Sequence, residues 1–196
     1  MMRYAEINRK TNETNIQLTL NIDGTGTADV KTGCGFLDHM LNLLAKHGKF
    51  DLTVKCDGDT EVDFHHTAED IGICLGEAFK KALGDKMGIT RYADTTLPMD
   101  EALILTAVDL SGRSFLACTL NFKATRVGSF DTELCEEFFR AFTSNANCNL
   151  HIVQLAGTNS HHIIEGVFKS AARSLRKACE IDSRFANDLP STKGVI

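Results

Sequence analysis

A short pattern of histidine and glutamate occurs twice in this chain. The run His-His-Thr-Ala-Glu at 65–69 recurs as His-His-Ile-Ile-Glu at 161–165, and the two runs hold four of the seven histidines. On an α-helix, residues four positions apart share a face, whereas adjacent residues point about 100° apart. The first histidine of each run and its glutamate can therefore bind one metal ion together, while the second histidine points elsewhere. One such pair would be typical of a solvated helix, but the repeat predicts two metal ions, each bound by both halves.

The repeat predicts two further ligands on the preceding amphipathic helices. His39 lies on such a helix in the first half, and Glu137 occupies the equivalent place in the second. If a pseudo-two-fold axis relates the halves, one ion is bound by His39, His66, His161 and Glu165. The other ion is bound by Glu137, His162, His65 and Glu69. Imidazole and carboxylate without thiolate suit Mn, Fe, Co or Zn, and four protein ligands leave octahedral positions open for Lewis-acid catalysis.

The elements that would position these residues follow the same repeat. Apolar residues at helical spacing predict helices, and polar–apolar alternation predicts strands. In the first half we expect strands at 3–10, 15–22, 26–31 and 50–56, and helices at 36–46 and 67–83. In the second half we expect strands at 90–97, 101–110, 114–121 and 149–155, and helices at 131–143 and 160–179. Each half is β-β-β-α-β-α, so we predict an α+β fold by internal duplication.

Each half has about 90 residues, which is near the lower limit for an independent hydrophobic core. We therefore expect residues 1–196 to form a single unit, with halves at about 1–88 and 89–181 and a polar C-terminal tail at 182–196. The economical packing places the helices together between two four-stranded sheets.

Composition restricts the classes of partner. The net charge is −5, and no basic stripe is present, so we expect no nucleic-acid partner. No apolar run reaches the length of a membrane span, and the first residues lack the apolar core of a signal peptide, so we expect a cytoplasmic protein. The seven cysteines are scattered without a C-x-x-C pair, which excludes a zinc ribbon and favours reduced, apolar thiols.

Several cations lie at element ends or beside turns, where hydroxyls and backbone amides are also available. Arg91, Arg113, Lys169 and Lys193 are of this kind, and such a combination suits a phosphate group. Taken singly, each is more typical of a surface charge. Glu13 lies in a polar loop between two predicted strands, and on its own it is typical of a solvated carboxylate.

Six motifs in their order along the chain resemble the imidazoleglycerol-phosphate dehydratase family of histidine biosynthesis. The resemblance covers the whole chain, and the motifs lie at 12–14, 35–41, 63–70, 109–113, 159–165 and 190–194. It implies a hydro-lyase (a carbon–oxygen lyase) that converts D-erythro-imidazoleglycerol phosphate to imidazoleacetol phosphate. It also implies two Mn²⁺ per chain, acting on the substrate imidazolate and bound at the eight positions deduced from the repeat.

The resemblance further implies roles for individual residues. Glu13 becomes the main candidate for proton transfer, with Glu165 as its metal-bound rival. Substrate contacts are implied for Glu13, His39, His47, His65, Glu69, Arg91, Arg113, His161, Lys169, Ser191, Thr192 and Lys193. The family also implies a homo-oligomer of 24 chains in cubic symmetry whose assembly depends on the metal.

Two other classes of protein would use histidine and glutamate in pairs. A ferritin-type storage cage uses Glu-x-x-His, the reverse of the order found here, and has no use for three strands per half. A generic dinuclear hydrolase is the other alternative. Turnover of imidazoleglycerol phosphate by metal-free and Mn-loaded protein separates all three.

Overall fold

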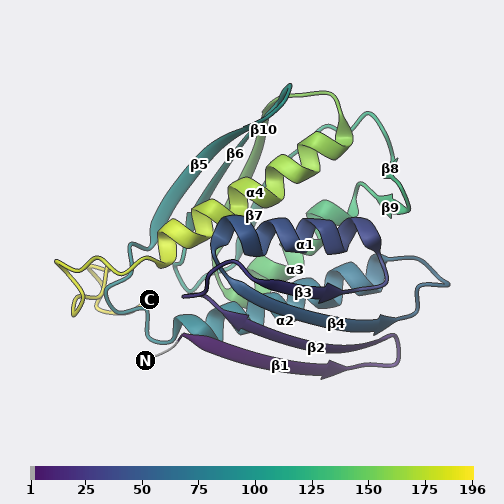
Figure 1. Ribbon diagram of the computed structural model, residues 1–196. Coiled ribbons are helices and arrows are strands. Elements are labelled where there is room, and N and C mark those ends of the chain that lie inside the picture. The colour runs from purple at the N-terminus through teal and green to yellow at the C-terminus, as the bar shows by residue number, and fades with distance from the viewer. Residues whose placement is uncertain (1–2) are drawn as a thin grey trace.

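Two four-stranded sheets lie on the outside of the protein, with the helices between them (Figure 1). The structure is a computed structural model, and it describes residues 3–196. The first sheet consists of β1 (Tyr4–Lys10), β2 (Thr14–Asn21), β3 (Ala28–Lys31) and β4 (Asp51–Gly58). Its strand order is β1-β2-β4-β3, and only the β3–β4 pair is parallel. In β2, Ile16, Leu18 and Leu20 alternate with polar residues and are fully buried, so one face of the sheet contacts the helices.

The second sheet repeats this arrangement. It consists of β5 (Tyr92–Met99), β6 (Ala102–Asp109), β7 (Phe115–Thr119) and β10 (Asn149–Ala156). Its order is β5-β6-β10-β7, and again only the last pair, β7–β10, is parallel. An antiparallel hairpin followed by a parallel pair in both sheets is the topology expected of a duplicated chain, and the predicted α+β fold is confirmed.

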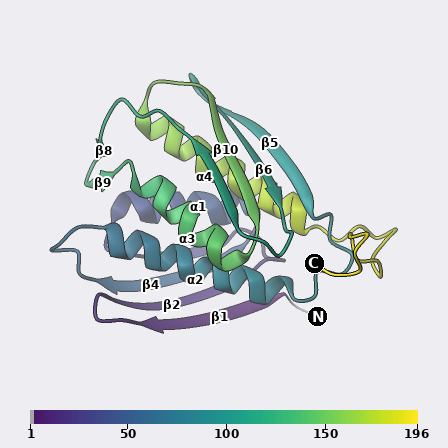
Figure 2. The ribbon, with the colours of Figure 1, turned by 180° about the vertical axis from the view of Figure 1, so that it is seen from behind.

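The helices of the described residues pack in two pairs between the sheets (Figure 2). They are α1 (Gly35–Gly48), α2 (His65–Leu83), α3 (Leu134–Ala146) and α4 (Ser160–Cys179). Helix α1 packs against α4, and α2 packs against α3. In each pair, the first helix of one half packs against the second helix of the other half. Each repeated His-His-x-x-Glu run therefore lies next to the first helix of the opposite half. None of the described helices has the length and apolarity needed to cross a bilayer.

Small residues allow α2 and α3 to approach closely. A Cβ atom on Gly72 would lie 2.6 Å from the carbonyl oxygen of Phe138, and one on Gly76 would lie 2.5 Å from that of Phe142. Only glycine permits such proximity of two backbones.

The structure differs from the sequence prediction mainly at element ends. The helix expected from 67 begins at His65, because the Asp63 side chain accepts a hydrogen bond of 2.7 Å from the His65 amide. The helix expected from 131 begins at Leu134, since residues 130–131 pair instead with 126–127 in a small hairpin. That hairpin, formed by β8 (Arg126–Val127) and β9 (Phe130–Asp131), was not predicted.

Candidate metal centre

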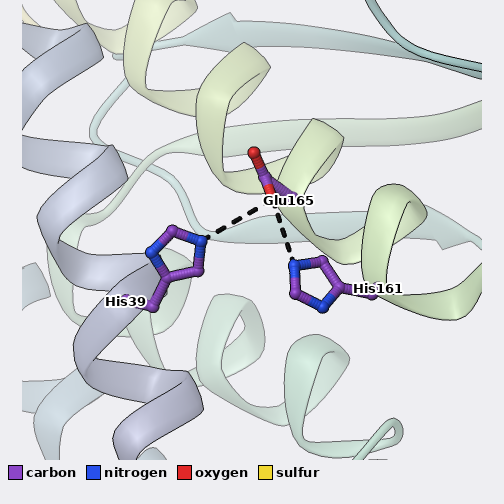
Figure 3. A group of neighbouring side chains, drawn as sticks. All are labelled: His39, His161 and Glu165. Atoms are coloured by element: carbon purple, nitrogen blue, oxygen red, sulfur yellow. Dashed lines mark hydrogen bonds and ion pairs between the residues drawn. The ribbon is translucent and has the colours of Figure 1, made fainter.

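Three of the predicted ligands converge between α1 and α4. His39 extends from α1, and His161 and Glu165 extend from successive turns of α4 (Figure 3). The Oε2 atom of Glu165 lies 3.2 Å from Nε2 of His161 and 3.7 Å from Nε2 of His39. One ligand atom from each residue lies within 4.8 Å of the other two. Two imidazole nitrogens and a carboxylate oxygen are thus directed at one point, as a divalent cation requires.

The local sequence at the start of α4 fixes two of these side chains. Asn159 caps the helix, and its Oδ1 atom accepts hydrogen bonds from the amides of His161 and His162 at 2.9 and 3.4 Å. The ring of Phe36 packs edge-on against the His161 ring, with centroids 5.1 Å apart. The helix therefore begins where the ligands are needed, and an aromatic contact from α1 holds one ring in place.

An ion pair between a half-buried lysine and the buried Glu165 adjoins the cluster. The Nζ atom of Lys169 lies 2.5 Å from Oε1 of Glu165, one helical turn away. Burial raises the pKa of Glu165, but the hydrogen bond and charge of Lys169 outweigh it and lower the pKa overall. Burial, with smaller contributions from Lys169 and Arg173, lowers the pKa of His47 on α1. Glu165 is thus held as a carboxylate, and burial together with the nearby cations favours the neutral form of His47.

His66 and His162, the second histidines of the two runs, point away from this cluster and each meets a carboxylate. Nδ1 of His66 lies 2.9 Å from Asp59, and Nδ1 of His162 lies 2.7 Å from Glu101. These hydrogen bonds raise the pKa of both imidazoles, and the one from His162 contributes most to lowering the pKa of Glu101 to about 2. The sequence analysis missed Asp59 and Glu101, because each is a loop residue whose distance in sequence from its histidine follows no helical or strand period.

The other predicted ligands lie on the second helix pair. His65 and Glu69 are on α2, and Glu137 is on α3, so the pairing of α2 with α3 mirrors that of α4 with α1. Within residues 3–196, however, only His39, His161 and Glu165 form a group with metal-ligand spacing. The Glu137 carboxylate instead lies 3.6 Å from Nε of Arg140, one turn along α3.

Glu13 lies in the turn between β1 and β2, close to the His66 ring. Its Oε1 atom is 3.7 Å from Nε2 of His66, and its side chain is 52% exposed. The loop is anchored, because the Asp59 amide donates to the Glu13 carbonyl at 3.0 Å. A loop residue predicted to face the substrate thus lies beside a predicted metal ligand.

Arg91 joins three segments at the far end of α4. Its guanidinium donates to Asp109 at 2.8 Å and to the carbonyl of Pro190 at 2.7 Å, and its own amide donates to the carbonyl of Ala178. Arg91 is buried. It therefore ties the last turn of α4 to the end of β6 and to the C-terminal tail.

The remaining predicted phosphate-binding residues lie around this junction. Arg113 is exposed in the turn after β6, where its amide donates to the hydroxyl of Ser111. In the tail, Ser191 donates to the carbonyl of Val195 at 2.8 Å and accepts from the Lys193 amide at 3.2 Å, while Thr192 and Lys193 are exposed. Lys169 is the exception, since it lies with the metal ligands.

The residues present fit a hard or borderline divalent cation. The donors are nitrogen and oxygen, and the carboxylate is buried and kept ionised by a neighbouring ammonium. With a duplicated α+β scaffold around it, this cluster places the chain in the class of internally repeated α+β proteins with a candidate metal site between helices.

Comparison with known proteins agrees with this class and narrows it. The profile of the family described as imidazoleglycerol-phosphate dehydratase matches residues 32–175. An imidazoleglycerol-phosphate dehydratase of Azorhizobium caulinodans is 57% identical over 195 residues, covering 100% of this chain and 99% of its own. One of Xanthobacter autotrophicus is 56% identical with the same coverage. The chain therefore belongs to the imidazoleglycerol-phosphate dehydratase family, and it is a hydro-lyase of histidine biosynthesis.

Solved structures of the family share the fold. The enzyme from Staphylococcus aureus has a TM-score of 0.84 at 37% identity, covering 91% of this chain and 99% of its own. That from Pyrococcus furiosus has a TM-score of 0.83 at 34% identity, covering 97% of this chain and 100% of its own.

Proposed function

We propose that this chain removes water from imidazoleglycerol phosphate to give imidazoleacetol phosphate, with two Mn²⁺ ions per chain. The supporting observation is the convergence of His39, His161 and Glu165 in a chain of a dehydratase family. The hydrogen that leaves is bound to carbon and has no carbonyl group beside it, so the imidazole ring must take part. As the imidazolate it can expel the hydroxyl group from the adjoining carbon, and the electron-poor ring that results then accepts the electron pair of the C–H bond as the proton leaves. Bound Mn²⁺ supplies the Lewis acidity that favours the imidazolate form of that ring.

The eight ligands form two equivalent sets. The first is His39, His161 and Glu165 with His66, and the second is Glu137, His65 and Glu69 with His162. Three members of each set come from one helix pair, α1–α4 or α2–α3, and the fourth is a histidine whose ring points to a carboxylate instead. We propose that this fourth ligand is supplied by a neighbouring chain, which completes each site.

Glu13 is the better of the two candidates for proton transfer. None of residues 3–196 donates a hydrogen bond to its half-exposed carboxylate, whereas the Glu165 oxygens are held by Lys169 and His161. A carboxylate that moves a proton must reach the substrate and exchange partners during the reaction. We therefore assign the acid–base role to Glu13 and a metal-binding role to Glu165.

The phosphate-binding residues provide the main argument for assembly. We propose that Arg91, Arg113, Ser191, Thr192 and Lys193 bind the substrate phosphate, at the end of α4 marked by Ala178. Along the helix axis, Ala178 lies about 20 Å from Glu165 at 1.5 Å per residue. Three carbons and an ester oxygen separate the substrate ring from its phosphorus, and at about 1.5 Å per bond they span less than half of that distance.

One substrate molecule consequently cannot reach both groups of a single chain. The metal ligands of one chain must face the phosphate-binding end of another, so we propose that the active enzyme is a homo-oligomer. The family resemblance suggests 24 chains in cubic symmetry, with the metal ions at chain–chain contacts.

Turnover of imidazoleglycerol phosphate by metal-stripped and Mn-loaded protein tests the proposed function. We expect activity only after loading, with close to two Mn per chain by elemental analysis and loss of one equivalent in His161→Ala. Saturation of the wild-type protein at one ion would overturn the two-ion assignment. Equal turnover with and without metal would overturn the role of the cluster.

A further inference from the structure

The rings of His66 and His162 are oriented in the same way by carboxylates from unrelated places. Nδ1 of His66 lies 2.9 Å from Oδ2 of Asp59, and Nδ1 of His162 lies 2.7 Å from Oε2 of Glu101. Asp59 follows β4, whereas Glu101 lies in the turn between β5 and β6. These positions are not equivalent in the two halves. Duplication alone does not explain the shared geometry, which indicates a common requirement on the two imidazoles.

An ionised carboxylate can only accept hydrogen bonds, so the Nδ1 atom in each pair carries the proton. In the neutral imidazole, the Nε2 atom then keeps its lone pair. It faces Glu13 at 3.7 Å in His66 and Asp100 at 3.8 Å in His162, both beyond hydrogen-bonding distance. Each Nε2 atom is therefore available to a metal ion, and a histidine that binds a metal usually donates its other N–H to such a carboxylate.

We propose that Asp59 and Glu101 are positioning residues that hold His66 and His162 in the Nδ1–H form, with Nε2 presented to a metal ion. This inference rests on the proposed function, because it takes the two histidines as metal ligands. It adds two residues that do not contact the metal or the substrate but determine whether the metal can bind.

Glu101 is restrained more tightly than Asp59. Its Oε1 atom accepts hydrogen bonds from the amides of Thr158 and Asn159 at 3.2 and 2.8 Å, which leaves Oε2 for His162. The Oδ1 atom of Asp59 is buried and accepts no hydrogen bond from residues 3–196. The two carboxylates therefore differ in how they should respond to replacement by an amide.

In Glu101→Gln, the amide oxygen must stay with the two backbone donors, so the NH₂ group faces Nδ1 of His162. Nδ1 then has to accept, which moves the proton to Nε2 and blocks the metal. In Asp59→Asn, no donor fixes the amide, and its oxygen can remain on His66. Glu101→Gln should therefore reverse the tautomer, whereas Asp59→Asn should preserve it and Asp59→Ala should release the ring.

The first experiment is ¹⁵N NMR of the histidine rings in metal-free protein, which reports the tautomer without depending on activity. We expect the Nδ1–H form at both histidines in the wild type and in Asp59→Asn, and the Nε2–H form at His162 in Glu101→Gln. A wild-type protein with Nε2–H rings, or an unchanged His162 in Glu101→Gln, would overturn the proposal.

The second experiment measures Mn²⁺ affinity by titration followed with EPR. Loss of such a hydrogen-bonding partner typically weakens metal binding by about 10- to 100-fold, and we expect this at one site in Glu101→Gln and at the other in Asp59→Ala. Matched controls are Glu180→Gln and Asp57→Asn, which alter exposed carboxylates that make no hydrogen bond to either ring. Wild-type affinity in both test variants refutes the positioning role. If wild-type protein binds no Mn²⁺, the proposed function fails instead, and the tautomer result stands separately.

Discussion

At the scale of single residues, the chemistry depends on which carboxylates are free and which are restrained. Glu165 is buried, contacts two imidazoles and is ion-paired to Lys169. Glu13 is half exposed and lies beside His66. The two glutamates named by the sequence analysis thus have distinct environments, one suited to holding a cation and the other to exchanging protons.

Glu13→Gln should lower kcat by about 10²- to 10⁴-fold, the usual contribution of a general acid or base. The Mn content should stay at the wild-type level, because Glu13 is outside both ligand sets. Steady-state kinetics and elemental analysis on the same sample test this. Full turnover by the variant would transfer the proton-transfer role to Glu165.

At the scale of elements, short polar contacts fix the loops and close backbone contacts fix the helices. Asp51 at the start of β4 illustrates the first kind. Its Oδ1 atom accepts from the amides of Thr25, Gly26 and Thr27 at 2.8, 3.2 and 3.1 Å. One carboxylate thus accepts hydrogen bonds from three backbone amides of the segment that connects β2 to β3.

Hydrogen bonds from the backbone at Thr25 and Thr27 lower the pKa of Asp51 below its usual value. A carboxyl group with a depressed pKa stabilises the fold above its unfolded-state pKa of about 3.9, and this contribution is lost as the pH falls through the lower folded value. Asp51→Ala should therefore cost about 1–2 kcal/mol at pH 7 and much less at pH 2. Urea unfolding at both pH values measures this, with Asp29→Ala on β3 as an exposed control. An equal loss at both pH values would show that the charge is unimportant.

The contact between α2 and α3 allows a second prediction at this scale. A Cβ on Gly76 would lie 2.5 Å from the Phe142 carbonyl and 2.9 Å from the Ala146 amide. Gly76→Ala should destabilise the protein by about 1–3 kcal/mol, because overpacking outweighs the gain in helix propensity. Gly35→Ala on α1, where nothing lies within 4 Å, is the control and should be neutral or stabilising. Thermal unfolding compares the two, and equal midpoints would contradict the close packing.

At the scale of the whole molecule, the dominant feature is the separation along α4 between the candidate metal ligands and the residues proposed to bind the phosphate. The ligands lie near its N-terminus, and the Arg91 junction lies at its C-terminus. Under the proposed function, this arrangement places the active sites between chains. On the same proposal, we expect metal removal to lower both activity and assembly, since chelation takes away the metal and protonated imidazole cannot bind it.

Mixed oligomers test the shared site. Arg113→Ala should raise KM by about 10- to 100-fold through loss of a charge-assisted hydrogen bond worth about 1.5–3 kcal/mol, and His161→Ala should remove one metal. When the two variants are dissociated, mixed and reassembled with Mn²⁺, some sites should receive an intact half from each chain, and activity should partly return. Light scattering confirms assembly, and each variant reassembled alone is the control. No recovery in verified hybrid oligomers would show that each site closes within one chain.

The sequence by itself determined the features that depend on short-range periodicity. Residues four apart on a helix must share a face, so His161 and Glu165 could be paired without a structure, and the repeat extended this to His39. Alternation in β2 likewise determined which residues are buried. The directions of these side chains agree with the structure, because helix and strand geometry converts spacing into direction.

Tertiary structure alone decided the contacts made between loops and across the halves. Asp59 and Glu101 reach their histidines through turns, and Arg91 reaches Pro190 through the path of the tail. No period relates such residues, because the direction of a loop is set by what it packs against. The tertiary structure also placed Lys169 with Glu165 rather than with Arg113, since the length of α4 separates the two groups of cations that looked alike in the sequence.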